Sequence, residues 1–530
     1  MILRSLAPLR RLGAVALLFV VLGACSDETP PPFEPTADPT PAPPRELTIT
    51  AIDRSTDAPM AGVALVVAGQ LAQTDADGAA TITAFGGDDV AASAPGFDPA
   101  SAEVPDSGDL IVELRSNVVR GTVIDADGAP IEDARVFVDG GEAIAYTDAD
   151  GAYELGGVPE EGTLIYKMPG HRLGEIAIDE EMVKDVVLPP FAVRALYSPS
   201  AVFEAPGRLD EMLALLGATE ANAMVIDVKE TGGYLFYSTQ LPSAVESGAI
   251  MEQPIFDLEE LLPQLKERGI YTIARMVVMK DNTVGATRPE LAVRNTATGG
   301  PWTDNIGGIW LDPAAPGVAE YVASIAGDLA DKGFDEVQLD YIRFFSDGPY
   351  DLADTNLPNS QSFRLPAIRR VMRLISDELE HRRAFLSAAV FPVSFIASDD
   401  QGIGQRPEVI MPYVDYFSPM VYPSHYGPGV FGFDVPNEYP YEVIDETLQL
   451  MNEQAEGLPM VIRPWIQDFG YGPFRAYGVA DVKAEMQAAA DNGAMGWMIW
   501  NAQARFTEAA LDPPRENEDA GPIMTAAPTP

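Results

Sequence analysis

The strongest constraint on the fold is an alternation of short apolar runs with amphipathic stretches between residues 191 and 510. The apolar runs predict buried strands, and the stretches between them have the apolar spacing of helices. Eight strands are expected, at Val193–Tyr197, Ala223–Val228, Tyr271–Val278, Glu336–Tyr341, Phe385–Phe391, Tyr413–Tyr422, Met460–Ile466 and Ala494–Trp500. Six helices are expected between them, at Leu209–Leu216, Leu258–Glu267, Pro316–Lys332, Leu365–His381, Tyr441–Gln454 and Ala480–Asn492. Such an alternation predicts an α/β unit with a parallel sheet, here a (β/α)8 barrel of the TIM type.

A doubly wound open sheet is the main alternative for this alternation. Such sheets usually carry a glycine-rich loop that binds phosphate after an early strand. Neither Gly-x-Gly-x-x-Gly nor a P-loop follows the early strands here, which favours the barrel. In a barrel, the functional side chains lie at the carboxyl ends of the strands.

Residues 46–115 and 116–190 are two copies of a smaller pattern, which we call the first and second repeats. Each contains Thr-Asp-Ala-Asp-Gly-Ala, at residues 74–79 and 147–152, followed later by a Pro-Gly turn. Asp-Gly pairs between short alternating runs indicate β-hairpins. The pattern resembles the carboxypeptidase regulatory-like family. This resemblance implies two small all-β, transthyretin-like sandwiches that act as spacers or adhesion modules without catalysis.

The Asp-x-Asp-Gly runs of the repeats permit two interpretations. Calcium loops contain similar runs, but Asp75–Gly78 lacks the downstream ligands of an EF-hand. The same residues suit tight turns, in which the aspartate carboxylate accepts hydrogen bonds from the backbone. We favour the turns, and we expect the repeats to be dispensable for chemistry because they contain no cluster of acids.

The first 25 residues have the layout of a secretory signal, in which arginines precede a short apolar run at residues 12–22. The run ends Leu-Gly-Ala-Cys25, which resembles the bacterial lipobox. This resemblance implies lipidation of Cys25 and a protein of the cell envelope, lipid-anchored in the outer membrane. Residues 26–45 are rich in proline and predict an extended linker. Residues 511–530 are expected to form a disordered tail.

Composition narrows the possible partners. The formal net charge is −46, with 80 acidic against 34 basic residues, and such a surface repels nucleic acid. The single cysteine excludes an intramolecular disulfide, and three scattered histidines make a zinc site hard to assemble. We therefore expect a monomer without metal, cofactor or nucleic-acid partner.

Three motifs lie at the ends of expected strands. They are Val337-Gln-Leu-Asp-Tyr-Ile-Arg-Phe344, Ser418-Pro-Met-Val-Tyr-Pro-Ser-His-Tyr426 and Arg463-Pro-Trp-Ile-Gln-Asp468. Together they resemble a bacterial family of glycoside hydrolases with a (β/α)8 barrel, and the likeness covers about residues 191–510. The resemblance implies a hydrolase that acts on a polysaccharide or oligosaccharide.

Glycoside hydrolysis needs two carboxyl groups beside the scissile bond, one ionised and one protonated. Asp340, at the end of the fourth strand, is the strongest candidate, and in related sugar-cleaving barrels an Asp at this place is the nucleophile. Its partner is expected to be Asp468, after the seventh strand, or Glu230, before a Gly-Gly turn after the second. The identity of the proton donor stays open because the fifth strand ends without an acid.

Substrate-binding side chains are expected around these carboxylates. Alternation puts Asp227 and Lys229 on one strand face, where they could pair. Arg343 could hold Asp340 ionised if the chain has left the strand by that residue. Aromatic rings at the strand ends suit stacking on sugars. The expected binding residues are Asp227, Lys229, Arg275, Arg343, Tyr422, His425, Trp465, Gln467, Trp500 and Asn501.

Two other functions are alternatives to a hydrolase. A non-catalytic carbohydrate-binding or envelope-structural protein would be favoured by a single acid without a partner. A metal-dependent polysaccharide deacetylase normally uses one aspartate and two histidines, and the scattered histidines argue against it.

Overall fold

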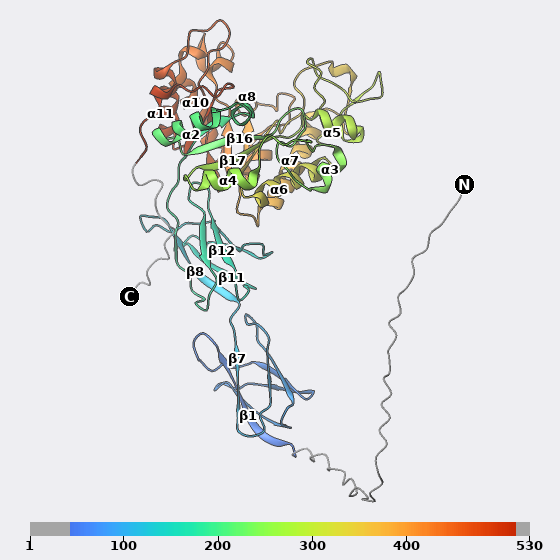
Figure 1. Ribbon diagram of the computed structural model, residues 1–530, viewed down its shortest axis with the longest axis vertical. Helices are drawn as coiled ribbons and strands as arrows, with labels where there is room; N and C mark the ends of the chain where they lie inside the picture. Colours follow the sequence, from blue (N-terminus) through green and yellow to red (C-terminus); the bar gives the residue numbers. More distant parts are fainter. Residues whose placement is uncertain (1–42, 516–530) are drawn as a thin grey trace, which may run out of the picture.

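The computed structural model describes residues 43–515, which form a column of three units (Figure 1). The α/β unit lies at one end, the second repeat lies beneath it, and the first repeat forms the other end. The expected lipobox and most of the expected linker lie outside the described residues. Within residues 43–515, no helix is both long and apolar enough to cross a membrane.

The two repeats share one strand topology. The first contains β1 (Arg45–Asp53), β2 (Ala64–Val67), β3 (Gln70–Gln73), β4 (Ala79–Ala84), β5 (Asp89–Ser93), β6 (Ala100–Glu103) and β7 (Leu110–Leu114). The second contains β8 (Val118–Ile124), β9 (Arg135–Val138), β10 (Ile144–Tyr146), β11 (Ala152–Gly156), β12 (Thr163–Lys167), β13 (Gly174–Ala177) and β14 (Val186–Val187). The first repeat pairs its strands as β4-β1-β7 and β3-β2-β5-β6, and the second as β11-β8-β14 and β10-β9-β12-β13. The strand orders are the same, which confirms two all-β repeats.

Each repeat is a sandwich around its own apolar core. In β5, Val90 and Ala92 are buried between exposed neighbours, so one face of the strand packs inward and the other meets water. The hairpin turns use their aspartates as expected. Asp75 Oδ1 accepts hydrogen bonds from the backbone N–H groups two and four residues later, at 2.9 and 3.0 Å, and Asp148 repeats this at 3.0 and 2.9 Å. These contacts explain the runs as turns.

The α/β unit is a closed parallel barrel. Its strands are β15 (Val193–Ser198), β16 (Ala223–Lys229), β17 (Tyr271–Val277), β19 (Glu336–Asp340), β21 (Phe385–Val390), β22 (Tyr416–Pro419), β23 (Val461–Ile462) with β24 (Trp465–Gln467), and β25 (Gly496–Trp500). β23 pairs with β22, β24 pairs with β25, and β25 pairs with β15, so the ring closes. β23 and β24 are two parts of the seventh strand, interrupted at Pro464, which has no N–H to donate. The expected (β/α)8 architecture is confirmed.

Six long helices surround the strands. They are α2 (Arg208–Ala218), α4 (Leu258–Lys266), α6 (Val318–Lys332), α7 (Gln361–Leu379), α10 (Pro440–Gln454) and α11 (Val479–Asp491). After the fifth strand there are only the single-turn helices α8 (Val393–Ile396) and α9 (Pro407–Ile410). The sixth strand is shorter than expected because Met411–Tyr413, with Pro412 at its centre, forms a 3-10 turn before it.

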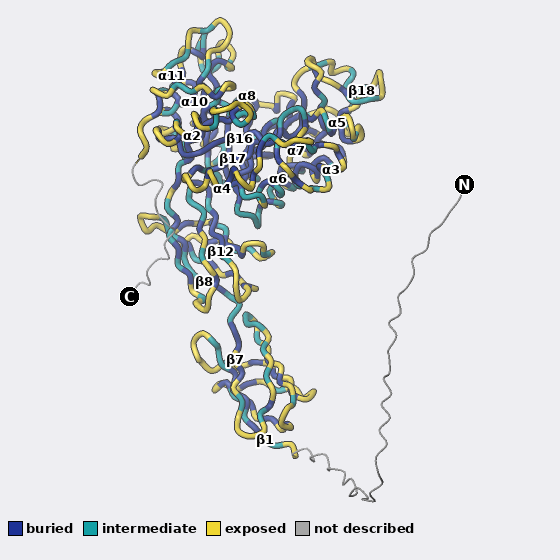
Figure 2. Tube along the Cα trace, viewed as in Figure 1, coloured by how far each residue is buried: buried dark blue, intermediate teal, exposed yellow. Residues whose placement is uncertain are grey.

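Burial differs between the barrel and the repeats (Figure 2). Every residue of β16, β19 and β21 is buried, because one face of each strand lines the barrel interior and the other meets the helices. The chain after the last strand also packs on the barrel. Arg515 Nη2 donates to Glu220 at 3.0 Å, so residues 511–515, expected in the tail, continue the folded unit.

The second repeat docks on the amino-terminal ends of the barrel strands. The N–H of Gly170 donates to Tyr416 Oη at 2.9 Å at the start of β22. Asp415, one residue earlier, pairs with Arg135 and lies 3.8 Å from Lys167 Nζ. The repeat therefore covers the base of the barrel, opposite the carboxyl ends of the strands.

Candidate active site

Three carboxylates at the carboxyl ends of neighbouring strands contact one arginine. Arg275 lies in β17, between β16 and β19. Its Nη1 donates to Asp227 Oδ1 at 2.5 Å and to Glu230 Oε1 at 3.1 Å. Its Nη2 and Nε donate to Asp340 Oδ2 at 2.6 and 3.1 Å. Asp227 is opposite Arg275 in register, and Asp340 is opposite Val277, two residues further along the same face.

Asp340 is the last residue of β19, and the chain bends sharply after it. Tyr341 has a φ of +55°, in the left-handed region that bulky residues rarely adopt. This bend lets the N–H of Tyr341 donate to Asp340 Oδ1 at 2.6 Å. One carboxylate oxygen of Asp340 is therefore held by the backbone and the other by Arg275, which fixes its orientation.

Asp227 is almost fully buried, and Tyr197 Oη donates a hydrogen bond to it. Burial raises the pKa of Asp227 to about 8, and the negative charge of Glu230 adds to the rise despite the opposing charge of Arg275. Burial would also raise the pKa of Glu230, but the charge of Arg275 and a hydrogen bond with Asp227 outweigh it, so this pKa is lowered. At neutral pH the proton of this pair therefore resides on Asp227.

Asp340 and Arg275 line a cleft of about 600 Å³ at the mouth of the barrel. Much of its wall is aromatic, formed by Tyr341, Phe391, Tyr422, His425, Phe469, Tyr471 and Trp500. Trp500 stacks on Tyr197, with ring centroids 3.9 Å apart, and this contact holds the indole ring in place. Aromatic faces beside carboxylates suit sugar rings, which have apolar faces and polar edges.

The second strand contains a bulge that directs Lys229 away from the site. Asp227 pairs with Arg275 and Lys229 pairs with Met276, so one residue of β16 is extra. The bulge breaks the alternation that would have put Asp227 and Lys229 on one face. Lys229 Nζ instead lies 2.8 Å from Asp281, with both side chains fully buried. The expected pairing of Lys229 with Asp227 is wrong.

Arg343 does not pair with Asp340, although the chain has left the strand by that residue. Its guanidinium lies over three aromatic rings, including Trp310 at 4.8 Å from the ring centroid, and these contacts hold it in place. Arg275 makes the contacts with Asp340 that were expected of Arg343. The sequence contains a signal for this role, since Arg275 is a charged residue within an apolar strand whose two neighbours each carry an aspartate at or near the carboxyl end.

Asp468 is directed toward the segment after the last strand. Its Oδ2 accepts from the N–H of Thr507 at 2.6 Å, and its Oδ1 accepts from Thr507 Oγ1 at 2.6 Å. Asp468 is buried and does not line the cleft, and its burial raises its pKa. The structure brings Glu230, Asp227 and Asp340 together and leaves Asp468 outside this group.

Two of the expected binding residues are buried supports. Trp465 Nε1 donates to Gln338 Oε1 at 3.1 Å inside the barrel. Gln467 Oε1 accepts from Ser424 Oγ at 2.8 Å, which links the ends of the sixth and seventh strands. Both side chains are almost fully enclosed, so they position the mouth of the barrel.

Of the other expected binding residues, Tyr422, His425, Trp500 and Asn501 line the cleft together with Arg275. His425 Nδ1 lies 2.9 Å from Ser424 Oγ, and partial burial lowers the pKa of His425, so the ring is mostly neutral at pH 7. Asn501 Nδ2 donates to the backbone oxygen of Asp468 at 2.6 Å, so its side chain holds the loop. Tyr422 and Trp500 present ring surface to the cleft. Among residues 43–515, no three His, Cys, Asp or Glu side chains are grouped so as to hold a metal ion.

Two families match this chain. The family described as "Putative glycosyl hydrolase domain" matches residues 195–506, which spans the barrel and the three carboxylates on Arg275. The chain belongs to this glycosyl hydrolase family. The carboxypeptidase regulatory-like domain matches residues 118–181, within the second repeat, and this assignment is also confirmed. No match was found among curated proteins.

Several solved structures are similar to the chain. A hypothetical protein from Ruminiclostridium thermocellum is 32% identical over 36% of this chain and 96% of its own, with a TM-score of 0.33. The PgaB (BpsB) glycoside hydrolase domain from Bordetella bronchiseptica is 13% identical over 61% of this chain and 99% of its own, with a TM-score of 0.44. The catalytic domain of a Paenibacillus polymyxa β-amylase is 11% identical over 61% of this chain and 95% of its own, with a TM-score of 0.41.

Proposed function

We propose that the barrel hydrolyses glycosidic bonds of a polysaccharide or oligosaccharide outside the cytoplasm, with Asp340 and Glu230 as the working carboxylates. The observation that carries the proposal is the contact of Asp340, Glu230 and Asp227 with the single guanidinium of Arg275 beside an aromatic cleft. Membership of the glycosyl hydrolase family supports the reaction class.

Asp340 is the proposed nucleophile or base. Its two oxygens accept from Arg275 and from the backbone N–H of Tyr341, so the carboxylate is oriented before substrate arrives. A fixed anion at the cleft wall can attack the anomeric carbon directly or orient a water for the attack. It also stabilises the positive charge that develops on the sugar ring in the transition state.

Glu230 is the proposed proton donor, supplied by Asp227. Glu230 is the more accessible of the two, with its side chain 38% exposed, whereas the side chain of Asp227 is 1% exposed. The proton held by Asp227 at neutral pH reaches the leaving-group oxygen through Glu230 as the glycosidic bond breaks. Asp468 is not part of this pair, because both of its oxygens accept from Thr507.

We also propose that lipidated Cys25 tethers the protein to the outer membrane. The support is the Leu-Gly-Ala-Cys sequence after a short apolar run. The Cys25→Ser variant is expected to leave the membrane fraction or to accumulate unprocessed. Unchanged fractionation with membranes would show that the lipid is not the tether.

The activity is tested by digesting a panel of soluble bacterial and plant glycans with the wild type and with Asp340→Asn, followed by product analysis. Asparagine keeps the shape of aspartate and removes its charge, so we expect new reducing ends from the wild type only. A folded Asp340→Asn variant with near-normal activity would contradict the proposed site. A wild type that binds glycans and cleaves none would favour the carbohydrate-binding alternative.

A further inference from the structure

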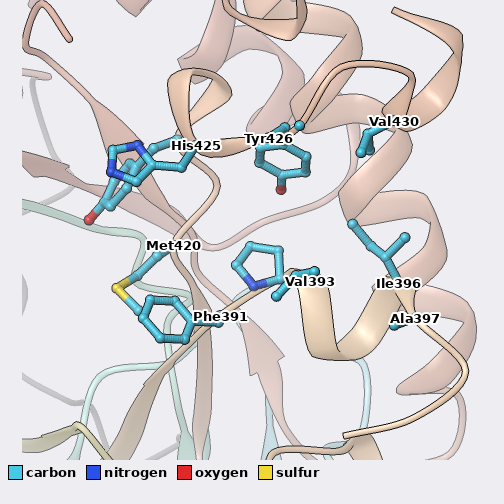
Figure 3. A pocket seen from close by; sticks show the side chains of 11 residues that line it. Phe391, Val393, Ile396, Ala397, Met420, His425, Tyr426 and Val430 are labelled. Atoms are coloured by element: carbon cyan, nitrogen blue, oxygen red, sulfur yellow. The ribbon is translucent and has the colours of Figure 1, made fainter. Parts of the chain in front are cut away.

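An apolar pocket of about 300 Å³ opens beside the cleft (Figure 3). Val393, Ile396 and Ala397, in and just after α8, form one wall, and Met420 and Phe391 form part of the opposite wall. α8 is one of the short helices that follow the fifth strand, where the other helices of the barrel are longer. The pocket therefore occupies the place where the regular barrel pattern is interrupted.

The pocket adjoins the cleft. Phe391, Met420, Tyr422 and His425 line both spaces. The cleft in turn contains Asp340. A molecule bound beside Asp340 can therefore extend into the pocket across these shared side chains.

Two of the polar groups at the pocket wall already have partners. Tyr426 Oη lies 3.0 Å from Thr447 Oγ1, and His425 Nδ1 lies 2.9 Å from Ser424 Oγ. A sugar placed here would lose hydrogen bonds to water and gain few in return, which costs free energy for each buried hydroxyl. The walls select against a hydroxyl-rich group and favour an apolar one.

We propose that this pocket binds an aliphatic chain attached to the saccharide in the cleft, so that the substrate is an amphiphilic glycan. The inference rests on the proposed function, because the sugar bound in the cleft positions the attached aliphatic chain at the pocket. The volume supports a chain over an acetyl group, since about 300 Å³ is roughly ten times the space of one water in the liquid. An acetyl methyl would leave most of the pocket empty. The chain has two possible sources, an aglycone or an acyl group on the sugar ring.

The test measures binding to the full chain carrying Asp340→Asn, so that turnover does not interfere. The probes are methyl, butyl, hexyl and octyl β-D-glucosides, titrated below their micellar concentrations by calorimetry. We expect Kd to fall by up to about fourfold for each added methylene, the ratio for a fully buried methylene. A parallel titration with 6-O-octanoyl-glucose distinguishes the sources, since tighter binding of this probe than of octyl glucoside indicates an acyl substituent.

Ile396→Trp fills the pocket without altering residues that line the cleft, and is expected to abolish the dependence on chain length. Val393→Asp is a second variant, at a side chain that is 51% exposed and therefore tolerant of change, and its charge is expected to weaken octyl binding at least tenfold. The matched control is Val245→Trp, at a 55% exposed position on α3 (Pro242–Ser247), which should bind like the parent.

Equal Kd values across the alkyl series would overturn the inference. Chain-length dependence that survives both Ile396→Trp and Val393→Asp would overturn it too, because the chain would then bind elsewhere. A change of oligomeric state in these variants without a change in alkyl binding would assign the pocket to a protein contact instead. If chain-dependent binding holds but the wild type cleaves no glycan, the proposed function fails and the apolar binding site stands.

Discussion

The two ends of the barrel each hold a buried cluster of charges, and the two clusters have opposite balances. At the mouth, three carboxylates share the guanidinium of Arg275. At the base, the single carboxylate of Asp415 lies between Arg135 and Lys167 of the second repeat. Asp227 and Asp415 are both buried, so the ratio of acids to bases around them accounts for the difference between the two ends.

The consequences appear in the pKa values. At the mouth, burial together with the charge of Glu230 raises the pKa of Asp227 to about 8. At the base, burial would raise the pKa of Asp415, but the charges of Arg135 and Lys167 outweigh it and the pKa is lowered. Where carboxylates outnumber basic groups, one carboxyl group keeps its proton at neutral pH and can transfer it in a reaction. Where basic groups outnumber carboxylates, the carboxylate stays ionised and forms structural ion pairs.

The residues of the base cluster also distinguish the second repeat from the first. Arg135 and Lys167 lie opposite each other on β9 and β12, and the corresponding cross-strand pair of the first repeat is Ala64 and Ser93. Ala64 and Ser93 are exposed. The two repeats share one fold, but only the second has basic side chains at these two positions. The second repeat docks on the barrel, and the first does not.

The largest expected effect concerns the mouth. Glu230→Gln should lower kcat/KM on natural glycans by roughly 10²–10⁴ because the leaving group is no longer protonated. On an aryl glycoside with an activated leaving group the loss should be much smaller, since little protonation is needed. Steady-state kinetics on both substrates check this. Equal losses on the two would remove Glu230 from the role of proton donor.

Asp415→Ala at the base should act on stability instead. Removing it leaves Arg135 and Lys167 without their counter-charge, which is expected to cost about 3–5 kcal/mol of unfolding free energy. Urea denaturation measures the loss, and kcat/KM of the folded protein should stay unchanged. The control is Asp139→Ala, which breaks the half-exposed pair with Arg383 at the same interface and should cost less than about 1 kcal/mol.

A pH profile sharpens the comparison further. The proton on Asp227 is present below its pKa of about 8, so kcat/KM should fall about tenfold per pH unit above that value. Asp227→Asn cannot supply this proton, so its kcat/KM at pH 7 should drop and the fall should begin at the lower pH at which Glu230 itself ionises. The stability contribution of Asp227 falls as pH rises from its unfolded pKa of 3.8 to about 8, because only the native state holds the proton in that range. An unchanged alkaline limb in Asp227→Asn would assign it to another group.

The smallest effect is expected for the first repeat. Removing residues 46–114 breaks the exposed Arg54–Glu160 pair and the contacts of Asp98 with Arg115 and Asn117, at 2.9 and 3.0 Å. Arg115 keeps its hydrogen bond to the backbone oxygen of Val158. The remaining protein should keep its kcat/KM, and its unfolding free energy should fall by no more than about 2 kcal/mol. A larger loss, seen by denaturation of the shortened chain, would mean that the two repeats stabilise each other.

Much of the fold could be predicted because its signals are local. Eight apolar runs and the helices between them identify the barrel, and the repeated Asp-Gly turns identify the two sandwiches. Asp340 follows from the same reasoning, as the acid that ends an apolar strand. Each of these inferences depends on residues that are close together in the chain.

The side-chain partners depended on tertiary structure. The bulge after Asp227 directs Lys229 away from the cleft. An extra residue of this kind reverses which side chains of the strand face inward, and the hydrophobic periodicity of the sequence does not reveal it. Asp468 is directed to Thr507, 39 residues later, by a loop whose path periodicity does not describe.

The sequence by itself therefore determined the order of strands and helices, the two repeats and the strand that supplies Asp340. The tertiary structure decided that Arg275 joins the three carboxylates, that Lys167 and Arg135 hold the base, and that an apolar pocket adjoins the cleft. The physical reason is that periodicity records which face of an element is buried. Which charges meet on that face depends on strand register, bulges and loop paths, which only the closed barrel sets.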